Sequence, residues 1–427
     1  MIFEKICVLG LGYIGLPTAC TFATHGVKVI GVDVNPRIVN TLHNGGLHIS
    51  EPGLRDLAEA AFSSKNLVIK REPEQADAFI IAVPTPFLEN KHADLRFVKS
   101  AAEAIVPYIQ PGNLIVLEST SPPRTTIDVV APILDKSGLK SGSDYRLVYS
   151  PERVLPGKIL HELIHNARVI GGIDFESAKA GRDLYSIFVE GEIVLTDSTT
   201  AEMIKLMENT QRDVNIALAN EFARLAERFG IDVWDAIEIA NRHPRVNILK
   251  PGPGVGGHCI GVDPWFLVES APDVAKLIKI ARQVNDDQPK YVIEIIQKCL
   301  GITETENFDG RKITILGLTY KPDVDDVRQS PAIRIGRILS EKNAHIEAYD
   351  PFIAKMELPG IKLMDSWQSA VQDSKLIVLL VAHTSLLEIN PFEMLACTDT
   401  RIVVDTVNGW NTDDWKKAGF EIVKLGT

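Results

Sequence analysis

The chain has 427 residues, of which 45% are hydrophobic and 24% charged, and its formal net charge is -11. This length exceeds what one hydrophobic core usually serves, so we expect two or three domains. The negative charge argues against a nucleic-acid backbone as the main partner. No apolar run reaches the ~18 to 20 residues of a membrane span, and the N-terminal apolar run reads as a first strand. We therefore predict a protein that binds neither nucleic acid nor membrane. Its five cysteines are widely scattered without a CxxC pair, which fits a reducing cytoplasm better than a disulfide framework.

Short apolar runs alternate with helical patterns through about the first 200 residues. Nearly continuous apolar runs are typical of parallel strands that are covered on both faces. The alternation predicts a doubly wound α/β domain. Its strands are predicted at residues 5–10, 27–33, 78–84, 113–119 and 145–150.

The segment GLGYIG follows the first predicted strand directly and places glycines at Gly10, Gly12 and Gly15. This spacing allows a tight turn, close approach of the backbone to a pyrophosphate, and packing of helix on strand. Asp33 closes the second predicted strand, where its carboxylate would bind the adenosine ribose hydroxyls and repel a 2′-phosphate. The pattern favours NAD over NADP. The alternatives are a glycine turn without a ligand and an Asp33 that only caps the next helix.

The middle of the chain has a different pattern. Residues 199–229 carry apolar side chains at helical spacing without a strong breaker, and Gly230 is a suitable stop. A helix of about 30 residues spans roughly 45 Å, so it would connect domains or form a subunit interface. The α/β rhythm resumes after residues 304–311, which predicts a second, smaller Rossmann-like domain. Its strands are predicted at residues 312–320, 345–351, 375–383 and 401–408.

One thiol stands in an unusual context, the segment PGPGVGGHCIGVDPW. Cys7, Cys20 and Cys299 lie in apolar strand or helix patterns, where a thiol is typically a small buried hydrophobe. Cys259 instead follows glycines that allow close approach to a ligand and leave amide groups for a phosphate or oxyanion. We predict that Cys259 is the working thiol. A metal at His258 and Cys259 lacks partners at ligand spacing, so we expect no metal.

A nicotinamide site combined with a reactive thiol has a specific chemical logic. A dehydrogenase without a nucleophile oxidises an alcohol once, whereas a thiolate can trap the aldehyde as a thiohemiacetal. Loss of a second hydride then gives a thioester, which water hydrolyses to an acid. Such chemistry needs an oxyanion stabiliser and a carboxylate that activates water.

Seven segments, taken in order, resemble the UDP-glucose/GDP-mannose dehydrogenase family over nearly the whole chain. The segments are GLGYIGLP, AVPTP, ESTSPP, SPERVLPG, TAEMIKLMEN, NRHPRVNILKPGPGVGGHCIGVDPW and LTYKPDVDDVRQSP. Members of this family oxidise C6 of a nucleotide-linked sugar to a carboxylate, using NAD twice and water once. The resemblance implies a catalytic centre where an NAD-binding domain, a helical domain and a UDP-binding domain meet.

The resemblance also implies domain ranges, an assembly and a substrate. The ranges are 1–198 for NAD binding, 199–305 for the helical domain that dimerises and carries the cysteine loop, and 306–427 for UDP binding. We expect a homodimer or a dimer of dimers. SPERVLPG and NRHPRVNI are similar to the branch that acts on UDP-N-acetylhexosamines, which implies oxidation of UDP-N-acetyl-D-mannosamine for polysaccharide biosynthesis. Pro156 stands where the UDP-glucose branch tends to have a second glutamate, which disfavours UDP-glucose.

The resemblance assigns catalytic roles by position. Cys259 matches the nucleophile, and Lys205 and Asn209, one helical turn apart, match the pair that stabilises the oxyanion and orients the substrate. Asp263 matches a carboxylate that assists proton or water handling. The structural alternatives are that Lys205 is a solvated charge, that Asn209 is a surface amide, and that Asp263 only forms a turn before Pro264.

The hydrolysis step has two further candidates in the resemblance. Glu152 matches the glutamate that activates water, and Thr120 matches a hydroxyl that holds it. Either residue could instead be a simple cap.

Ligand contacts follow from the same resemblance. It implies NAD contacts by Gly10, Leu11, Gly12, Tyr13, Ile14, Gly15, Asp33, Arg37, Thr85, Thr120 and Arg328. It implies substrate contacts by Glu152, Arg153, Val154, Lys205, Asn209, Arg242, His243, Arg245, Lys250, Gly254, Gly256, Tyr320 and Lys321. Arg37 fits equally well as a surface arginine. One basic residue of NRHPRV would reach a neighbouring subunit's substrate, and Arg242, His243 and Arg245 all qualify.

Other functions stay open at this level. A UDP-N-acetylglucosamine or UDP-glucose 6-dehydrogenase differs only in pocket details. A two-electron dehydrogenase of the hydroxyacid type shares the architecture but does not need Cys259. A non-catalytic nucleotide-sugar sensor would bind both ligands without forming NADH.

Overall fold

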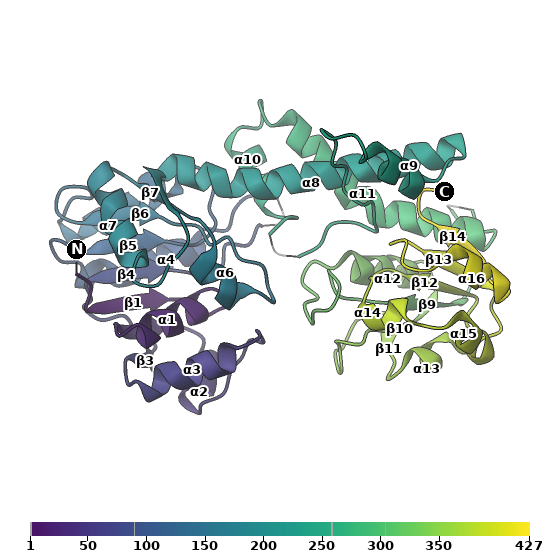
Figure 1. The fold of residues 1–427 in the computed structure, drawn as a ribbon, viewed down its shortest axis with the longest axis horizontal. Coiled ribbons are helices and arrows are strands. Elements are labelled where there is room, and N and C mark those ends of the chain that lie inside the picture. The colour runs from purple at the N-terminus through teal and green to yellow at the C-terminus, as the bar shows by residue number, and fades with distance from the viewer. Residues whose placement is uncertain (1, 89, 258, 304) are drawn as a thin grey trace. The chain divides into compact units, whose positions relative to one another are not determined.

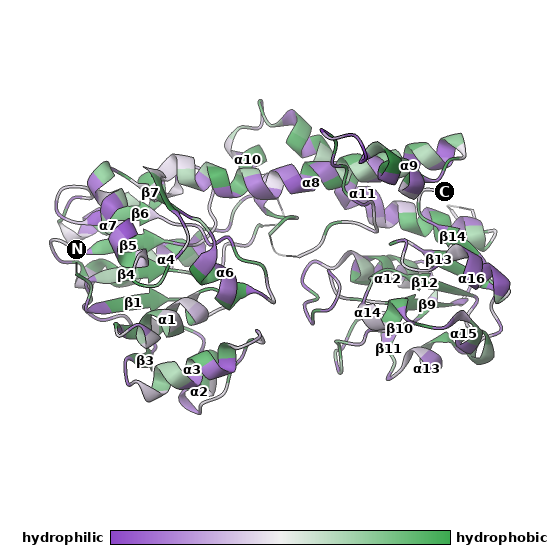
Figure 2. Ribbon diagram, in the orientation of Figure 1, coloured by the Kyte–Doolittle hydropathy of each residue, from purple (hydrophilic) through white to green (hydrophobic). Residues whose placement is uncertain are grey.

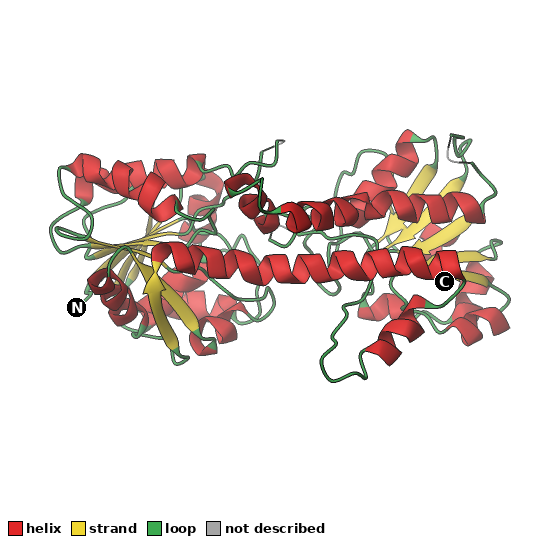
Figure 3. Cartoon of the chain, turned by 90° about the horizontal axis from the view of Figure 1, so that it is seen from above, coloured by secondary structure: helices red, strands yellow, loops and turns green. Residues whose placement is uncertain are grey.

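The computed structural model describes residues 2–88, 90–257, 259–303 and 305–427 (Figure 1). These residues form two compact units. The first unit comprises Met1–Glu208 with Trp265–Pro272, and the second comprises Asn209–Pro264 with Asp273–Thr427. The division between them falls within one uninterrupted helix, α8 (Ser198–Phe229), which is seen along its length in Figure 3.

The first unit is built on an eight-stranded sheet in the order β3-β2-β1-β4-β5-β6-β7-β8. The first six strands of that order are parallel and follow the doubly wound arrangement 3-2-1-4-5-6, whereas β7 runs antiparallel to β6. The strands are β1 (Lys5–Leu9), β2 (Lys28–Val32), β3 (Leu67–Lys70), β4 (Ala78–Ile81), β5 (Leu114–Leu117), β6 (Arg146–Tyr149), β7 (Arg168–Gly172) and β8 (Ile193–Asp197).

Helices cover both faces of this sheet, as expected for parallel strands that are apolar throughout. Alternate strand residues enter different cores, since Ile6 and Val8 pack in one cluster and Cys7 and Leu9 in the other. The central strands are accordingly coloured as hydrophobic in Figure 2. The helices and short helical turns before α8 are α1 (Gly15–Thr24), α2 (Pro36–His43), α3 (Leu54–Ser63), α4 (Arg96–Ile105), η1 (Val106–Tyr108), η2 (Thr126–Val130), α5 (Ala131–Leu134), η3 (Asp135–Ser137), α6 (Ile159–His165) and α7 (Phe175–Tyr185).

The second unit contains a six-stranded parallel sheet in the order β11-β10-β9-β12-β13-β14. This is again the doubly wound arrangement. In both sheets, the direction in which successive strands are added reverses at the first strand. The strands are β9 (Lys312–Leu316), β10 (His345–Tyr349), β11 (Ile361–Leu363), β12 (Leu376–Leu379), β13 (Ile402–Asp405) and β14 (Glu421–Lys424).

The remaining helices complete the chain. The helices between α8 and the C-terminus are α9 (Val233–Ala240), α10 (Asp263–Ser270), α11 (Lys276–Cys299), α12 (Pro331–Glu341), α13 (Trp367–Val371), α14 (Thr384–Leu387), α15 (Pro391–Cys397) and α16 (Thr412–Lys417). In the second unit, α11 and α12 pack one face of the sheet, and Trp410 and Trp415 belong to the core on the other face.

The fold class predicted from the sequence is confirmed: two doubly wound α/β parts accompany a helical middle with one long helix. Every strand predicted from an apolar run is present, although each ends earlier than predicted. Five strands were not predicted because they are short, amphipathic or interrupted by glycine, namely β3, β7, β8, β11 and β14. Within the described ranges, no helix combines the length and apolar composition that crossing a bilayer requires.

A buried ion pair joins α8 and α11 within the second unit. The Arg282 guanidinium donates to Asp213 and to Asp286, and both Arg282 and Asp213 are buried. Asn285 adds a hydrogen bond of 2.8 Å to the same Asp213 oxygen. Burial raises the pKa of Asp213, which the neighbouring Arg282 opposes. The guanidinium is therefore what allows a carboxylate between these helices.

Removal of the cation should be severely destabilising. We expect Arg282→Ala to lower the free energy of unfolding by about 3–5 kcal/mol, since it leaves Asp213 buried without its countercharge. Urea denaturation followed by circular dichroism measures this loss. Lys290→Ala, which removes an exposed cation from the same helix, is the matched control and should change stability by less than about 0.5 kcal/mol. Equal effects of the two substitutions would contradict the role given to Arg282.

Candidate active site

The glycine loop after β1 has the geometry that its spacing predicted. Gly10 has a φ of +93°, and its N–H donates to the Val32 carbonyl at 2.8 Å. A Cβ on Gly15 would lie 1.8 Å from the Gly10 carbonyl oxygen, so helix α1 packs directly on the turn. A Cβ on Gly12 would meet no atom within 4 Å. Gly12 therefore faces open space, which is where a phosphate would need close approach to the backbone.

Asp33 follows β2 and holds this loop. Its carboxylate accepts hydrogen bonds from the Leu11 N–H at 3.0 Å and from the Asn35 N–H at 2.8 Å. Asp33 is not the cap of the following helix, because the side chain of Asn35 caps α2 by accepting from the Arg37 N–H. The Arg37 side chain is exposed.

These residues fit a dinucleotide. Helix α1 begins at Gly15 without a side-chain cap, so the positive end of its dipole is directed at the loop and no side chain occupies that position. Tyr13 and Ile14 are half-buried in the same loop. The residues that would hold NAD are the glycine loop and Asp33, and their contacts with the cofactor stay a prediction.

Two threonines come together at the carboxyl ends of β4 and β5. The Thr85 hydroxyl donates to the Thr120 carbonyl at 2.6 Å, and both residues are partly exposed. Ser119 supports the same junction by donating to the Val83 carbonyl at 2.7 Å. Because the carboxyl ends of parallel strands form the ligand side of a doubly wound sheet, both threonines lie at the edge where the glycine loop also lies.

Glu152 follows β6 and is held by an arginine that the sequence did not single out. The Glu152 Oε2 accepts from Arg168 Nη1 at 3.0 Å, and Oε1 accepts from the N–H of Arg153 at 2.8 Å. The Glu152 side chain is 9% exposed. It is thus an oriented, mostly buried carboxylate and not a helix cap.

The neighbours of Glu152 are fixed by contacts of their own. The Arg153 guanidinium donates to Glu208 and to the Ala167 carbonyl, and Val154 packs against the core on one face of the sheet. The following backbone is held by the buried Glu51, which accepts from the N–H groups of Gly157 and Ile159, each at 2.8 Å. Glu51 is a second residue that sequence reasoning missed.

Lys205 lies on α8 and is half-buried. Among the described residues, its ammonium has no hydrogen bond or ion pair. A half-buried cation without an internal partner suits an anionic ligand. A solvated lysine on the helix surface would show the same lack of partners, so the role of Lys205 stays a prediction.

In the second unit, the glycines before Cys259 pack against the loop that follows β9. A Cβ on Gly256 would lie 2.8 Å from the Tyr320 Cβ and 2.7 Å from Pro331, and one on Gly257 would lie 2.8 Å from the Tyr320 ring. Gly257 also has a φ of +83°, and its N–H donates to the Arg328 carbonyl at 3.1 Å. These glycines are required because another loop of the protein lies against them.

Gly254 and Lys250 lie earlier in the same segment. A Cβ on Gly254 would lie 3.1 Å from Pro331, and Lys250 is exposed.

Cys259 is partly exposed and precedes the first turn of α10. Its carbonyl accepts from the N–H groups of Val262 and Asp263, at 3.0 and 2.9 Å. Asp263 begins α10, and its carboxylate accepts from the side-chain amide of Asn209. Two of the predicted catalytic residues are thus in direct contact, and the third is joined to them through the backbone. His258 lies outside the described residues.

Three of the other cysteines are unsuited to act as nucleophiles. Burial raises the pKa of Cys7 and of Cys20 to about 12, and that of Cys299 to about 11. A thiol with such a pKa is almost entirely protonated near neutral pH. These raised pKa values agree with the prediction that the three cysteines pack as small hydrophobes.

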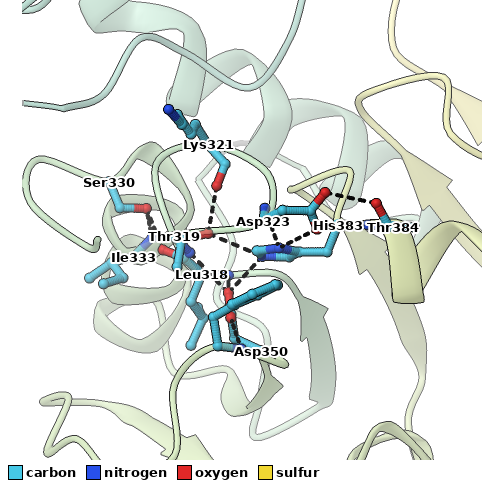
Figure 4. Close-up of polar contacts among 10 residues, drawn as sticks. Leu318, Thr319, Lys321, Asp323, Ser330, Ile333, Asp350, His383 and Thr384 are labelled. Atoms are coloured by element: carbon cyan, nitrogen blue, oxygen red, sulfur yellow. Dashed lines mark hydrogen bonds and ion pairs between the residues drawn. The ribbon is translucent and has the colours of Figure 1, made fainter. Parts of the chain in front are cut away.

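The loop that carries Tyr320 and Lys321 is anchored on a buried carboxylate at the end of β10. Asp350 Oδ2 accepts from the N–H groups of Leu318 and Thr319, at 2.6 and 3.0 Å (Figure 4). Burial opposes the charge, but hydrogen bonds from His383 and from the Leu318 N–H lower the pKa of Asp350. The carboxylate is therefore ionised at neutral pH and holds the start of the loop.

His383 holds the other side of this loop. Its Nε2 lies 3.0 Å from Asp350 Oδ2 and 3.1 Å from the Thr319 hydroxyl, and its Nδ1 accepts from the Asp323 N–H at 3.0 Å (Figure 4). The Thr319 hydroxyl in turn donates to the Lys321 carbonyl at 3.0 Å. With Nδ1 as acceptor, Nε2 carries the ring proton. Backbone on both sides of Tyr320 and Lys321 is thus fixed by one buried pair.

The predicted basic contacts are exposed. Arg328 forms a bidentate pair with Asp326 in its own loop, at 2.6 and 2.9 Å. One loop carries the exposed side chains of Arg242, His243 and Arg245. The Asn241 side chain closes this loop by hydrogen bonds to the carbonyl and the N–H of Ile248. Arg242 pairs with Glu238 at 3.2 Å on the same surface. Nothing in these contacts separates the three basic residues.

The residues missed from the sequence share one property, which is that their role comes from a partner far along the chain.

Within the described ranges, no group of three or more histidine, cysteine or acidic side chains is arranged to hold a metal.

Family models match three successive parts of the chain. Residues 4–189 match the NAD binding domain of the UDP-glucose/GDP-mannose dehydrogenase family, residues 199–287 its central domain, and residues 314–412 its UDP binding domain.

Individual relatives agree with these matches. A protein of Methanococcus maripaludis named UDP-N-acetyl-D-mannosamine dehydrogenase is 49% identical over 99% of this chain and 97% of its own length. A protein of Ralstonia solanacearum named NDP-N-acetyl-D-galactosaminuronic acid dehydrogenase is 44% identical over 96% of this chain and 97% of its own length. The solved structure of a UDP-D-ManNAc dehydrogenase from Pyrococcus horikoshii superposes with a TM-score of 0.91, at 37% identity and 99% coverage of both chains.

The two glycines of the NAD loop should respond differently to alanine. Gly12→Ala adds a methyl group to open space, so we expect a folded protein whose Kd for NAD rises about tenfold or more. Gly15→Ala forces a contact with the Gly10 carbonyl, so we expect a loss of stability in the same unit. Thermal unfolding and NAD titration by calorimetry separate the effects. Unchanged NAD affinity in Gly12→Ala would contradict the placement of the pyrophosphate.

The anchor of the Tyr320 loop offers a second test. His383→Ala removes hydrogen bonds to Asp350, Thr319 and Asp323, so we expect the Kd for UDP to rise about tenfold while NAD affinity is retained. Calorimetric titration with UDP measures the change. His345→Ala, which alters an exposed histidine of the same unit, is the control. An unchanged Kd for UDP in His383→Ala would show that the loop needs no such anchor.

Proposed function

This chain belongs to the UDP-glucose/GDP-mannose dehydrogenase family, and we propose that it oxidises C6 of UDP-N-acetyl-D-mannosamine to the carboxylate in two successive steps. The observation that carries the choice of sugar is the 49% identity, over nearly all of both chains, to the Methanococcus protein named for that substrate. The Pyrococcus structure named for the same sugar supports the choice.

NAD, when bound, would supply the hydride acceptor for each oxidation. We assign its binding to the glycine loop, to Asp33 and to Thr85, with Arg328 as a further contact. The dehydrogenase class and the NAD cofactor are those of the family.

The chain's own side chains supply the remaining chemistry. The Cys259 sulfur adds to the aldehyde carbon, giving a thiohemiacetal, and after the second hydride loss it is bound as a thioester. Lys205 and Asn209 stabilise the negative oxygen that forms in these steps. Asp263, which accepts the Asn209 amide, keeps that amide oriented.

Water then cleaves the thioester. Glu152 accepts a proton from the attacking water while Thr120 holds it, the C–S bond breaks, and the Cys259 thiolate is regenerated. In sum, R–CH₂OH, water and two NAD⁺ give R–COO⁻, two NADH and three H⁺. The partly exposed Cys259 thiol supports this scheme, because three other thiols of the chain are held protonated by burial.

We further propose the domain ranges 1–198, 199–305 and 306–427, a homodimer formed through the helical part, and a cytoplasmic location. Exposed apolar side chains along α8 support a subunit interface there. They are Met203, Met207, Leu218, Leu225 and Phe229.

A second sugar has a specific observation in its favour. The Ralstonia relative, which is 44% identical, is named for an N-acetyl-galactosaminuronic acid. Sugars of the N-acetylhexosamine class differ at C2 or C4, where one changed side chain in the pocket alters preference. UDP-N-acetylglucosamine and UDP-glucose are the remaining candidates within the family.

The decisive measurement is the stoichiometry of NADH against product with a panel of UDP-sugars. We expect UDP-N-acetyl-D-mannosamine to give the highest kcat/KM and two NADH per uronate formed. One NADH per sugar would refute the double oxidation, and binding without NADH would indicate a sensor.

Cys259→Ser tests the nucleophile. Because a serine hydroxyl is a far weaker nucleophile than a thiolate, we expect uronate formation to fall at least about a hundredfold, with UDP and NAD affinities retained. Product is quantified by mass spectrometry. Cys397→Ser, which alters another partly exposed thiol, is the control. Wild-type uronate production by Cys259→Ser would contradict the assignment.

A further inference from the structure

Arg168, the first residue of β7, is buried and donates in three directions. Its Nε donates to the Ser150 hydroxyl at 2.9 Å, its Nη1 to Glu152 Oε2 at 3.0 Å, and its Nη2 to Glu118 Oε1. Because a guanidinium is planar, these donors fix its plane and therefore the position of both carboxylates. One buried cation is shared between two acids that come from different strands.

Glu118 is the inner acid of this group. It follows β5 and is fully enclosed, and its Oε1 also accepts from the Tyr185 hydroxyl at 2.6 Å. Its Oε2 is buried and has no hydrogen-bond partner among the described residues. A carboxylate oxygen that is neither solvated nor hydrogen-bonded is costly when it is charged. Burial raises the pKa of Glu118 above its ordinary value, against the lowering effect of Arg168.

The ionisable groups that face Glu118 come from each element packed around it. They are Arg168 from β7, Glu152 after β6 and Tyr185 at the end of α7, whose ring lies 3.7 Å from the guanidinium carbon of Arg168. Burial and the charge of Glu118 raise the pKa of Tyr185 well above its usual value, so the phenol stays neutral. Glu118 is therefore the acid in this group whose ionisation is shifted toward neutral pH.

We propose that Arg168 is the positioning residue of the Glu152 carboxylate, and that the ionisation of Glu118 determines how much of the Arg168 charge Glu152 receives. The inference rests on the proposed function, in which Glu152 activates the water that cleaves the thioester.

The physical reason is competition for one cation. When Glu118 is protonated, Arg168 and Glu152 form an isolated ion pair, and the guanidinium attracts the Glu152 carboxylate alone. When Glu118 is ionised, the guanidinium is shared and the added negative charge repels that of Glu152. Glu152 then takes a proton from water more readily. Hydrolysis therefore accelerates as pH rises through the ionisation of Glu118.

Glu118→Gln imitates the protonated acid without changing its shape. The amide oxygen still accepts from Arg168 and Tyr185, but the side chain no longer titrates. In the wild type, we expect thioester hydrolysis to accelerate about threefold between about pH 6 and about pH 8. In Glu118→Gln, we expect the rate of thioester hydrolysis to be nearly independent of pH. It should stay close to the lower rate that the wild type shows at about pH 6. Glu103→Gln, the same change at an exposed glutamate, is the control and should retain the wild-type slope.

The measurement isolates hydrolysis from hydride transfer. Enzyme acylated by substrate and NAD is mixed into buffers of different pH, quenched at intervals, and the covalent adduct is followed by intact-protein mass spectrometry. The initial burst of NADH reports the earlier steps in the same samples.

Arg168→Lys tests the positioning role. An ammonium cannot make the planar set of three contacts, so we expect adduct decay to slow at least about tenfold at every pH. The KM for the UDP-sugar and the initial NADH burst should change less than about twofold. Arg182→Lys, an exposed arginine of α7, is the control. If Arg168→Lys loses the initial NADH burst as well as adduct decay, the substitution has damaged the enzyme generally, and the positioning role is overturned.

The outcomes separate this inference from the proposed function. Two NADH per sugar with a wild-type slope in Glu118→Gln would overturn the inference alone. One NADH per sugar, with no covalent adduct, would overturn the proposed function and this inference with it.

Discussion

A carboxylate at the end of the second strand holds the loop after the first strand in each of the two sheets. Asp33 accepts the N–H of Leu11 at 3.0 Å, and Asp350 accepts the N–H of Leu318 at 2.6 Å. Adjacent parallel strands end at the same edge, so this contact fixes a loop that would otherwise be free to close over the ligand side. The glycine loop in one sheet and the loop of Tyr320 in the other both depend on it.

The same requirement for close backbone approach explains the glycines before the reactive thiol. Gly256 and Gly257 admit Tyr320 and Pro331 at distances that a side chain would not allow. The cysteine segment and the loop after β9 are therefore packed as one body within the second unit. The glycine content alone suggests a flexible segment, but the structure shows that the segment is tightly packed. The backbone that leads to Cys259 is held by residues within 314–412, which match the UDP binding domain.

Two buried charge groups, one in each unit, differ in what surrounds them. Asp213 and Arg282 are enclosed between two helices, and the group they form holds those helices together. The group around Arg168 extends from the enclosed Glu118 to the mostly buried Glu152. A charge that is set inside the protein can thus act on the side chain to which we assign the activation of water, because electrostatic interactions decay slowly where water is excluded.

The sequence by itself determined the features that depend on neighbouring residues. Apolar runs predicted the central strands, the glycine spacing predicted the turn at Gly10, and helical spacing predicted α8 almost to its ends. Edge strands and the strand beginning with Arg168 were missed because their local pattern is weak. Only the tertiary structure decided which charges meet. Glu118 and Arg168 are 50 residues apart, and Asp350 and His383 are 33 apart. Such contacts follow from strand order, which long-range packing sets and local residue patterns do not encode.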